Sequence, residues 1–154
     1  NFQNIGKVRS RGVETSYVGQ DVLVHGLDLL GSVAYTQSKI LANAQNPASV
    51  GKYFYRIPLW RVNLAATYHI DERAALTLAA RYSGRQYNTL TNTDTNPDVF
   101  GGTSSYTVVD AKLTFRPTKL SEIGIGVDNL FDERYFVYHP YPGRTFYVEA
   151  KLRM

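Results

Sequence analysis

The stretch Gly143-Arg-Thr-Phe-Tyr-Val-Glu-Ala-Lys-Leu-Arg-Met154 alternates between apolar and polar residues from Phe146 onward. Successive side chains of a β-strand point to opposite faces, so one face should be wholly apolar and the other should carry Glu149, Lys151 and Arg153. A helical period does not separate the residues in this way. The stretch therefore predicts a β-strand. Alternation alone leaves open whether its apolar face meets a protein core or lipid.

Six further stretches of the sequence show the same alternation. They are residues 5–17, 27–40, 60–70, 74–87, 106–116 and 123–131. The predicted strands are about 10–13 residues long, roughly twice the 5–6 residues of a typical globular strand. They are close to the 9–11 residues that a tilted membrane strand needs. Their length favours a transmembrane β-barrel.

The connections between the predicted strands alternate in length. Short turns lie near residues 19–21, 71–73 and 117–119, and long loops lie near residues 41–58, 88–105 and 132–142. Because consecutive strands of a meander run antiparallel, all the long loops lie at one end of the sheet. Outer-membrane β-barrels have this arrangement, with short periplasmic turns and long extracellular loops.

Aromatic residues lie near both ends of the apolar stripes. Tyr35, Trp60, Tyr82, Phe131 and Phe146 are near the long loops, and Tyr17, Tyr68 and Phe115 are near the short turns. Aromatic rings are enriched at the two membrane interfaces, so these residues predict two girdles that bound a lipid-facing band. The eight steps from Trp60 to Tyr68 span about 26 Å along the strand. The predicted fold is all-β, with about seven antiparallel transmembrane strands.

Composition sets further limits. The chain has 154 residues, no Cys and a net charge of +4, and no run approaches the roughly 18 apolar residues of a membrane helix. Its basic residues are scattered, so no nucleic-acid partner is expected. Two other folds stay open. One is a soluble, lipocalin-like binding barrel with the apolar faces inside, and the other is a small complete outer-membrane barrel of structural or adhesive role.

The predicted strand number is odd. Bacterial outer-membrane barrels normally have an even number of strands, and an edge left open in lipid exposes unpaired backbone groups at several kcal/mol each. We therefore expect residues 1–154 to be the C-terminal segment of a larger transmembrane β-barrel. The small complete barrel would require an eighth strand, which is possible only if one of the predicted strands is in fact two strands.

Several motifs resemble those of TonB-dependent outer-membrane receptors. They are Asp128-Asn-Leu-Phe-Asp-Glu-Arg-Tyr135, Tyr141-Pro-Gly-Arg144, Arg11-Gly-Val-Glu14 and Arg81-Tyr-Ser-Gly-Arg-Gln-Tyr87. The resemblance implies a barrel of about 22 strands, closed by an N-terminal plug domain. It implies uptake of a ferric siderophore, haem, cobalamin or a similar metal chelate with energy from the TonB complex. No stretch resembles the plug domain or the TonB box, so both are expected outside this chain.

The same resemblance implies a location in the bacterial outer membrane. Outer-membrane lipid and the barrel-assembly machinery would then be partners of the protein. Family members usually end on Phe or Trp, which the assembly machinery reads, whereas this sequence has Met154. The terminal residue therefore departs from the family pattern.

Candidate ligand-binding residues come from the long loops and from the polar face beside them. Aromatic side chains at the extracellular mouth could bind an apolar or aromatic chelate by stacking and by hydroxyl hydrogen bonds, and arginines could attract an anionic ferric complex. The candidates are Tyr53, Tyr55, Arg81, Arg85, Tyr87, Tyr135, Tyr138 and His139. The alternative is that these side chains only pack the loops or face water.

Other chemistry has little support in the sequence. His25, His69 and His139 are far apart, so no metal site is expected, and no cofactor is implied. No nucleophile motif is present, so no catalytic residue is predicted and a receptor is expected rather than an enzyme. Gly124 and Gly126 are interpreted as small residues that leave space for a plug on the inner face.

Overall fold

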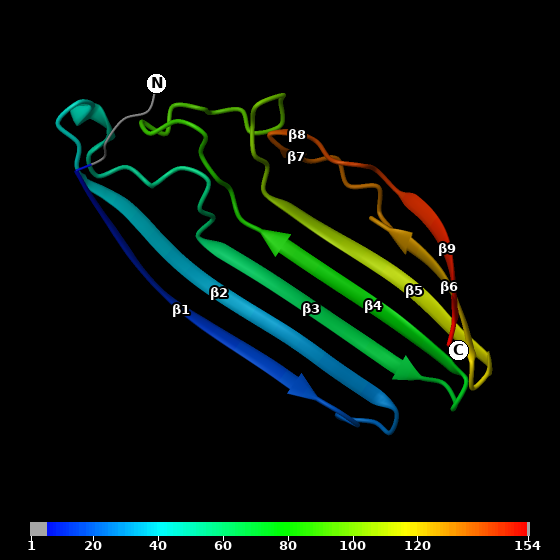
Figure 1. Ribbon diagram of the computed structural model, residues 1–154. Coiled ribbons are helices and arrows are strands. Elements are labelled where there is room, and N and C mark those ends of the chain that lie inside the picture. The colour runs from blue at the N-terminus through cyan, green and yellow to red at the C-terminus, as the bar shows by residue number, and fades with distance from the viewer. Residues whose placement is uncertain (1–5, 154) are drawn as a thin grey trace.

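The computed structural model describes residues 6–153. Its main feature is a single seven-stranded antiparallel sheet in the order β1-β2-β3-β4-β5-β6-β9, which curves like part of a barrel wall (Figure 1). The strands are β1 (Lys7–Gly19), β2 (Leu27–Ala42), β3 (Trp60–His69), β4 (Ala74–Ser83), β5 (Tyr106–Thr118), β6 (Ser121–Asp128) and β9 (Thr145–Leu152). The predicted seven antiparallel strands are confirmed.

The ends of some strands differ from the prediction. β4 ends at Ser83 rather than at residue 87. Its partner β3 begins at Trp60, and the carbonyl of Trp60 already bonds to Gly84, so β3 has no residue left to pair with residues 85–87. The long loops contain a short 3-10 helix, η1 (Pro47–Ser49), and a small hairpin of β7 (Phe136–Val137) and β8 (His139–Pro140), which alternation did not predict. No helix in residues 6–153 is long and apolar enough to cross a membrane. Ile5 and Met154 lie outside the described residues.

The register of the strands sorts the side chains onto two faces. One row across the sheet joins Gly31, Leu64, Ala80 and Val109, and the adjacent row joins Ser32, Asn63, Arg81 and Val108. The apolar face is open, and Leu64 at its centre is 51% exposed. No second layer covers this face within residues 6–153, where the buried hydrophobic residues are Ile40, Val108 and Tyr135. The apolar residues therefore do not form the inside of a sandwich.

Aromatic residues form two oblique rows on the apolar face. In the row near the long loops, Trp60 pairs with Tyr35, and Tyr82 pairs with Val62, two residues further from those loops. The other row drifts in the same direction, through Tyr17, Tyr68 and Phe115. Such a drift is expected when strands are tilted to the barrel axis. Phe146 also lies on this face.

Phe131 lies outside the strand that was predicted for residues 123–131. It follows the end of β6 at Asp128, so it belongs to a loop rather than to a strand, and it is 70% exposed. The predicted strand is too long at this end, and the place of Phe131 in the girdle stays a prediction. In the structure, Asn129 takes a positive φ of 55° and ends the extended chain.

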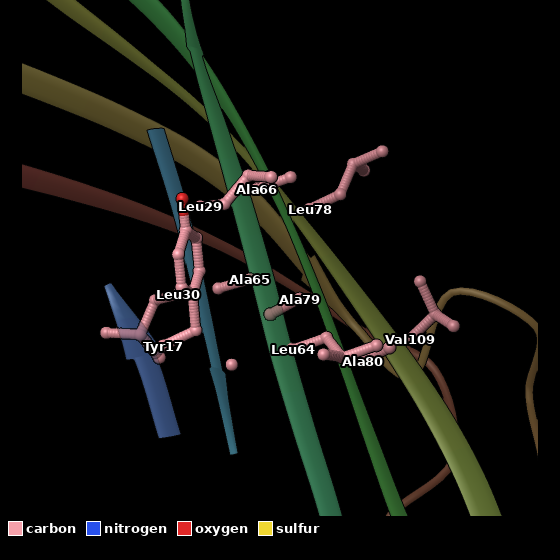
Figure 2. A pocket seen from close by; sticks show the side chains of 11 residues that line it. Tyr17, Leu29, Leu30, Leu64, Ala65, Ala66, Leu78, Ala79, Ala80 and Val109 are labelled. Carbon is pink, nitrogen blue, oxygen red and sulfur yellow. The ribbon is translucent and has the colours of Figure 1, made fainter. Parts of the chain in front are cut away.

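A shallow hollow of about 460 Å³ lies at the centre of the sheet (Figure 2). It forms because the small residues Gly31, Ala66 and Ala80 lie beside the larger side chains of Leu64 and Leu78. Tyr17 closes one side and Val109 the other. The hollow is lined by apolar groups and reaches the row of aromatic residues near the short turns at Tyr17.

The polar face carries ion pairs between neighbouring strands. Arg81 pairs with Asp110 at 3.2 Å, Arg116 pairs with Glu122 at 2.9 Å, and Lys112 pairs with Glu149. A further pair joins Lys151 to Glu122 at 3.4 Å. The charged residues of the terminal strand β9 are therefore compensated within the sheet.

The space beside the two glycines of β6 is occupied by side chains of this chain. A Cβ atom at Gly126 would lie 2.2 Å from the ring of Tyr147, and one at Gly124 would lie 2.8 Å from the side chain of Glu149. The glycines accommodate neighbours on β9 and β5, so they do not leave open space for another domain at these positions.

Candidate functional site

The three long loops, residues 43–59, 84–105 and 129–144, lie at one end of the sheet (Figure 1). The first two are joined through Asn92, whose side chain accepts a hydrogen bond from the Tyr53 N–H (2.8 Å) and donates one to the Tyr53 carbonyl (2.9 Å). The Arg56 N–H also donates to the Tyr87 carbonyl (2.8 Å). These bonds hold residues that are more than thirty positions apart in the sequence.

The second and third loops are joined through their backbones. The Gly101 N–H donates to the Tyr138 carbonyl (2.7 Å), and the Tyr138 N–H donates to the Gly102 carbonyl (2.8 Å). The Ser104 N–H donates to the Phe136 carbonyl (2.8 Å), and the Ser104 hydroxyl accepts from the Phe136 N–H (2.9 Å). The three loops therefore form one connected layer, which we call the loop layer.

The Asp128–Tyr135 motif forms the base of the third loop. The buried side chain of Asn129 donates to the carbonyls of Glu133 (2.9 Å) and Pro142 (3.3 Å), and it accepts from the Glu133 N–H (2.8 Å). Asp132 accepts from the Arg144 N–H (2.8 Å), close to Gly143. The motif therefore has a structural role, because its polar side chains satisfy backbone groups of the loop.

Of two further candidate residues, one is buried and the other is exposed but held by an ion pair. Tyr135 is 3% exposed and stacks between Tyr106 and Tyr141, with ring centroids 4.2 and 4.9 Å away. Its burial raises the pKa of its hydroxyl. Arg81 belongs to β4 and pairs with Asp110. The expectation that Tyr135 is an open ligand contact is wrong in this structure, because its ring is part of an aromatic stack below the loop.

Two tyrosine rings of the loop layer each have a cation nearby, one from β2 and one from the second loop. The rings of Tyr53 and Tyr87 are parallel within 3°, with centroids 6.4 Å apart. The Lys39 ammonium lies 5.3 Å from the Tyr53 ring, and the Arg85 guanidinium lies 4.9 Å from the Tyr87 ring. Arg85 also donates to the carbonyl of Asp94 (2.7 Å). The structure thus brings Tyr53, Arg85 and Tyr87 together in one cluster.

A second cluster links the first and third loops. The guanidinium of Arg56 lies 4.9 Å from the Tyr138 ring, which makes an edge contact with His139. The His139 ring also packs on Phe100 of the second loop, with a centroid distance of 4.8 Å. Tyr55 contacts Phe54 and lies beside this cluster in the sequence, with its ring partly exposed.

Carboxylates of the loop layer accept hydrogen bonds from backbone N–H groups and hydroxyl groups of the same loop. Asp94 accepts from the Asn88 N–H (2.8 Å) and the Thr89 hydroxyl (2.7 Å), and Asp98 accepts from the Ser104 hydroxyl (2.7 Å). Partial burial raises the pKa of the Asp94 carboxyl, but hydrogen bonds from Asn88, Thr89 and the backbone of Asp94 itself outweigh this effect, so the pKa lies below its ordinary value. No cluster of three or more His, Asp or Glu residues in the described part of the chain could hold a metal ion.

The lowered pKa of Asp94 predicts a loss of loop order in acid. A carboxyl with a depressed pKa contributes stability that is complete above its unfolded pKa, about 3.9, and that is lost as pH falls through the lower folded value. We expect the second loop to be cleaved faster by an acid-active protease at pH 3 than at pH 5. The variant Asp94→Asn should be cleaved at a rate that changes less over this range, and equal pH dependence in both proteins would contradict the prediction.

Comparison with known proteins fixes the family. Residues 1–130 match the family described as "TonB dependent receptor-like, beta-barrel". The chain belongs to the TonB-dependent receptors. The resemblance seen in the sequence motifs is thereby confirmed.

Individual TonB-dependent receptors show the same likeness. The chain is 34% identical over 90 residues to a TonB-dependent receptor of Haemophilus influenzae, which covers 56% of this chain and 26% of that protein. It is 27% identical to the catecholate siderophore receptor Fiu of Escherichia coli K12, over 98% of this chain and 20% of Fiu. The chain thus spans about a quarter or less of these relatives. Both relatives are receptors by name, which places the chain in a non-enzyme family.

Solved structures of ferric chelate import and uptake receptors have the same fold. The crystal structure of Fiu in its closed form superposes with a TM-score of 0.74 at 25% identity, over 94% of this chain and 21% of Fiu. The ferric yersiniabactin uptake receptor FyuA of Yersinia pestis gives a TM-score of 0.79 at 22% identity, over 97% of this chain and 24% of FyuA. The seven strands therefore correspond to part of a receptor barrel.

Sequence reasoning missed Arg56, Asn88 and Asn92. Asn88 donates from its amide to the Gly101 carbonyl (2.8 Å) and the Thr103 hydroxyl (3.0 Å), and it accepts from Nε of Arg56 (3.2 Å). The one signal available was that Asn88 and Asn92 lie in a long loop predicted from its Asn, Asp, Thr, Gly and Pro content. Asn tolerates positive φ, and Asn92 has φ 54°.

Proposed function

We propose that this chain is the C-terminal part of the barrel of an outer-membrane receptor that takes up a ferric siderophore or a similar metal chelate. The open apolar face, with its two rows of aromatic rings, supports contact with outer-membrane lipid. The barrel-assembly machinery would insert such a protein. Transport would be energised through the TonB complex, which acts on parts of the receptor that lie outside this chain.

The edges of the sheet support a larger barrel. Within residues 6–153, β1 and β9 each pair with one neighbour only, and unpaired backbone groups are costly in lipid. Further strands would close the barrel between these two edges. A plug domain would fill its interior and would also lie outside this chain.

The loop layer is the observation that carries the proposed ligand class. Tyrosine rings and cations meet there on three loops that are bonded to one another. Rings bind the organic part of a chelate by stacking, and cations attract its charged oxygens. A siderophore supplies its own iron ligands, so the protein needs no metal-binding side chains. The name of Fiu, a catecholate siderophore receptor, supports the same ligand class.

Uptake by cells tests this proposal. The whole receptor, expressed in a strain without its own siderophore receptors, should take up radioactive iron as a ferric siderophore complex, and removal of TonB should abolish the uptake. A screen of ferric catecholate, hydroxamate and carboxylate complexes would name the ligand. No TonB-dependent uptake of any of them would refute the proposed function.

The Tyr53–Tyr87 stack gives a specific prediction. Tyr87→Ala should weaken chelate binding by the whole receptor about five- to tenfold, corresponding to roughly 1–1.4 kcal/mol, because it removes one ring of the stack. Tyr87→Phe keeps the ring and should bind within about twofold of the wild type. Quenching of intrinsic fluorescence by the ferric chelate would measure both affinities. Equal affinities of Tyr87→Ala and the wild type would exclude this stack from the site.

A further inference from the structure

Arg56 lies where the three long loops meet. It belongs to the first loop, its N–H donates to the Tyr87 carbonyl (2.8 Å), and its Nε donates to the Asn88 side chain (3.2 Å). Its guanidinium lies 4.9 Å from the ring of Tyr138 on the third loop. One side chain therefore contacts both of the other loops.

The guanidinium of Arg56 keeps hydrogen-bond donors for a ligand. Its Nε is used by Asn88, whereas neither terminal nitrogen donates to any group within residues 6–153. The side chain is exposed. A planar guanidinium that rests on an aromatic ring presents its edge outward, and this edge matches two anionic oxygens of a carboxylate or a catecholate.

Some cations of the chain have a carboxylate partner and others do not. On the strands, Arg81, Lys112 and Arg116 each have one, whereas no ion pair within residues 6–153 involves Arg9, Arg11 or Arg61. In the loop layer, the carboxylates Asp94, Asp98 and Asp132 accept hydrogen bonds from backbone or hydroxyl groups. No ion pair involves the cations Lys39, Arg56 or Arg85 among the pairs found in the described part of the chain. Their positive charge is left for another molecule.

The backbone of Arg56 is unusual for its residue type. Its φ is 58°, in the left-handed region that residues other than Gly, Asn and Asp seldom adopt. Such a conformation persists where the surroundings fix it, and here the hydrogen bond from its own N–H to Tyr87 does so. The strained backbone aims the side chain across the second loop toward Tyr138.

We infer that Arg56 is the residue that selects an anionic chelate, through charge-assisted hydrogen bonds from its terminal nitrogens to ligand oxygens. This inference rests on the proposed function and names the charge class of its ligand. Lys39 and Arg85 add to the positive potential of the same layer. The contacts of Arg56 with Tyr87, Asn88 and Tyr138 hold its guanidinium in place before the ligand arrives.

The test uses the whole receptor in detergent and two ferric probes of similar size, a trianionic tris-catecholate complex and a neutral tris-hydroxamate complex. Arg56→Gln should bind the anionic complex at least tenfold more weakly than the wild type and should bind the neutral complex within twofold. Arg56→Lys keeps the charge without the planar edge and should be intermediate. Arg134→Gln, which removes another exposed loop arginine, is the matched control and should leave both affinities within twofold.

Salt dependence separates an electrostatic role from a structural one. Affinity of the wild type for the anionic complex should fall between 50 and 500 mM NaCl, and Arg56→Gln should show a smaller fall. Equal losses for both complexes, or an unchanged salt dependence, would show that Arg56 only holds the loops and would overturn the inference. A wild type that prefers the neutral complex would overturn it while leaving chelate uptake intact. A wild type that binds neither complex nor any other ferric chelate would refute the proposed function as well.

Discussion

Leu64→Arg is expected to prevent stable folding of the receptor in the outer membrane. Leu64 is at the centre of the apolar face, four residues from both Trp60 and Tyr68. An arginine at the bilayer midplane of a barrel costs about 2–4 kcal/mol when it faces lipid. The folded barrel should therefore fall to a small fraction of the wild-type amount. Heat-modifiable mobility on gels of outer-membrane fractions would measure it.

Asn63→Arg is the matched control, because it places the same side chain one residue away on the opposite face. Asn63 shares its row with Ser32 and Arg81, so a charge there meets polar groups. This variant should fold to near the wild-type level. The reverse outcome, with Asn63→Arg unfolded and Leu64→Arg tolerated, would show that the apolar face is turned inward.

Asn129→Ala is expected to destabilise the third long loop by about 1–3 kcal/mol. The substitution removes three hydrogen bonds to the backbone of Glu133 and Pro142, and it leaves those backbone groups without their partner. It also puts Ala at a φ of 55°, a conformation that adds about 1 kcal/mol for a residue with a Cβ. Faster protease cleavage within residues 129–144 of the folded receptor would report the change.

Two further variants divide this effect into its parts. Asn129→Gly permits the positive φ but lacks the side chain. It should therefore regain only the stability that Asn129→Ala loses through backbone strain. Asn129→Asp keeps an acceptor for the Glu133 N–H and should be cleaved more slowly than Asn129→Ala. Equal cleavage of the wild type and Asn129→Ala would contradict the structural role of the motif.

The strands were predictable because alternation is a local property. Trp60, Val62 and Leu64 fall on one face whatever the rest of the chain does, so the strands and their faces could be derived from the sequence. Strand ends depend on the partner instead. β4 stops where β3 has begun, and the one local signal of this end is Gly84. The β7–β8 hairpin was missed because its strands have two residues each and Tyr138 between them has φ 68°.

The sequence predicted which aromatic residues lie in the long loops, but not how these residues are arranged. Their role in ligand binding stays a prediction. The contacts between Arg56 and Asn88 or between Tyr53 and Asn92 join positions 32 and 39 residues apart, and loops carry no periodic pattern that fixes such pairings. Burial of Tyr135 likewise depends on Tyr106 and Tyr141, which reach it from β5 and from further along its own loop.

The backbone bonds between the three long loops have a consequence for engineering and for divergence among relatives. Exchange of the second loop alone for that of another receptor would leave the carbonyls of Tyr53, Phe136 and Tyr138 without their donors and the N–H groups of these residues without their acceptors. Ligand preference should therefore transfer only when all three loops are grafted together.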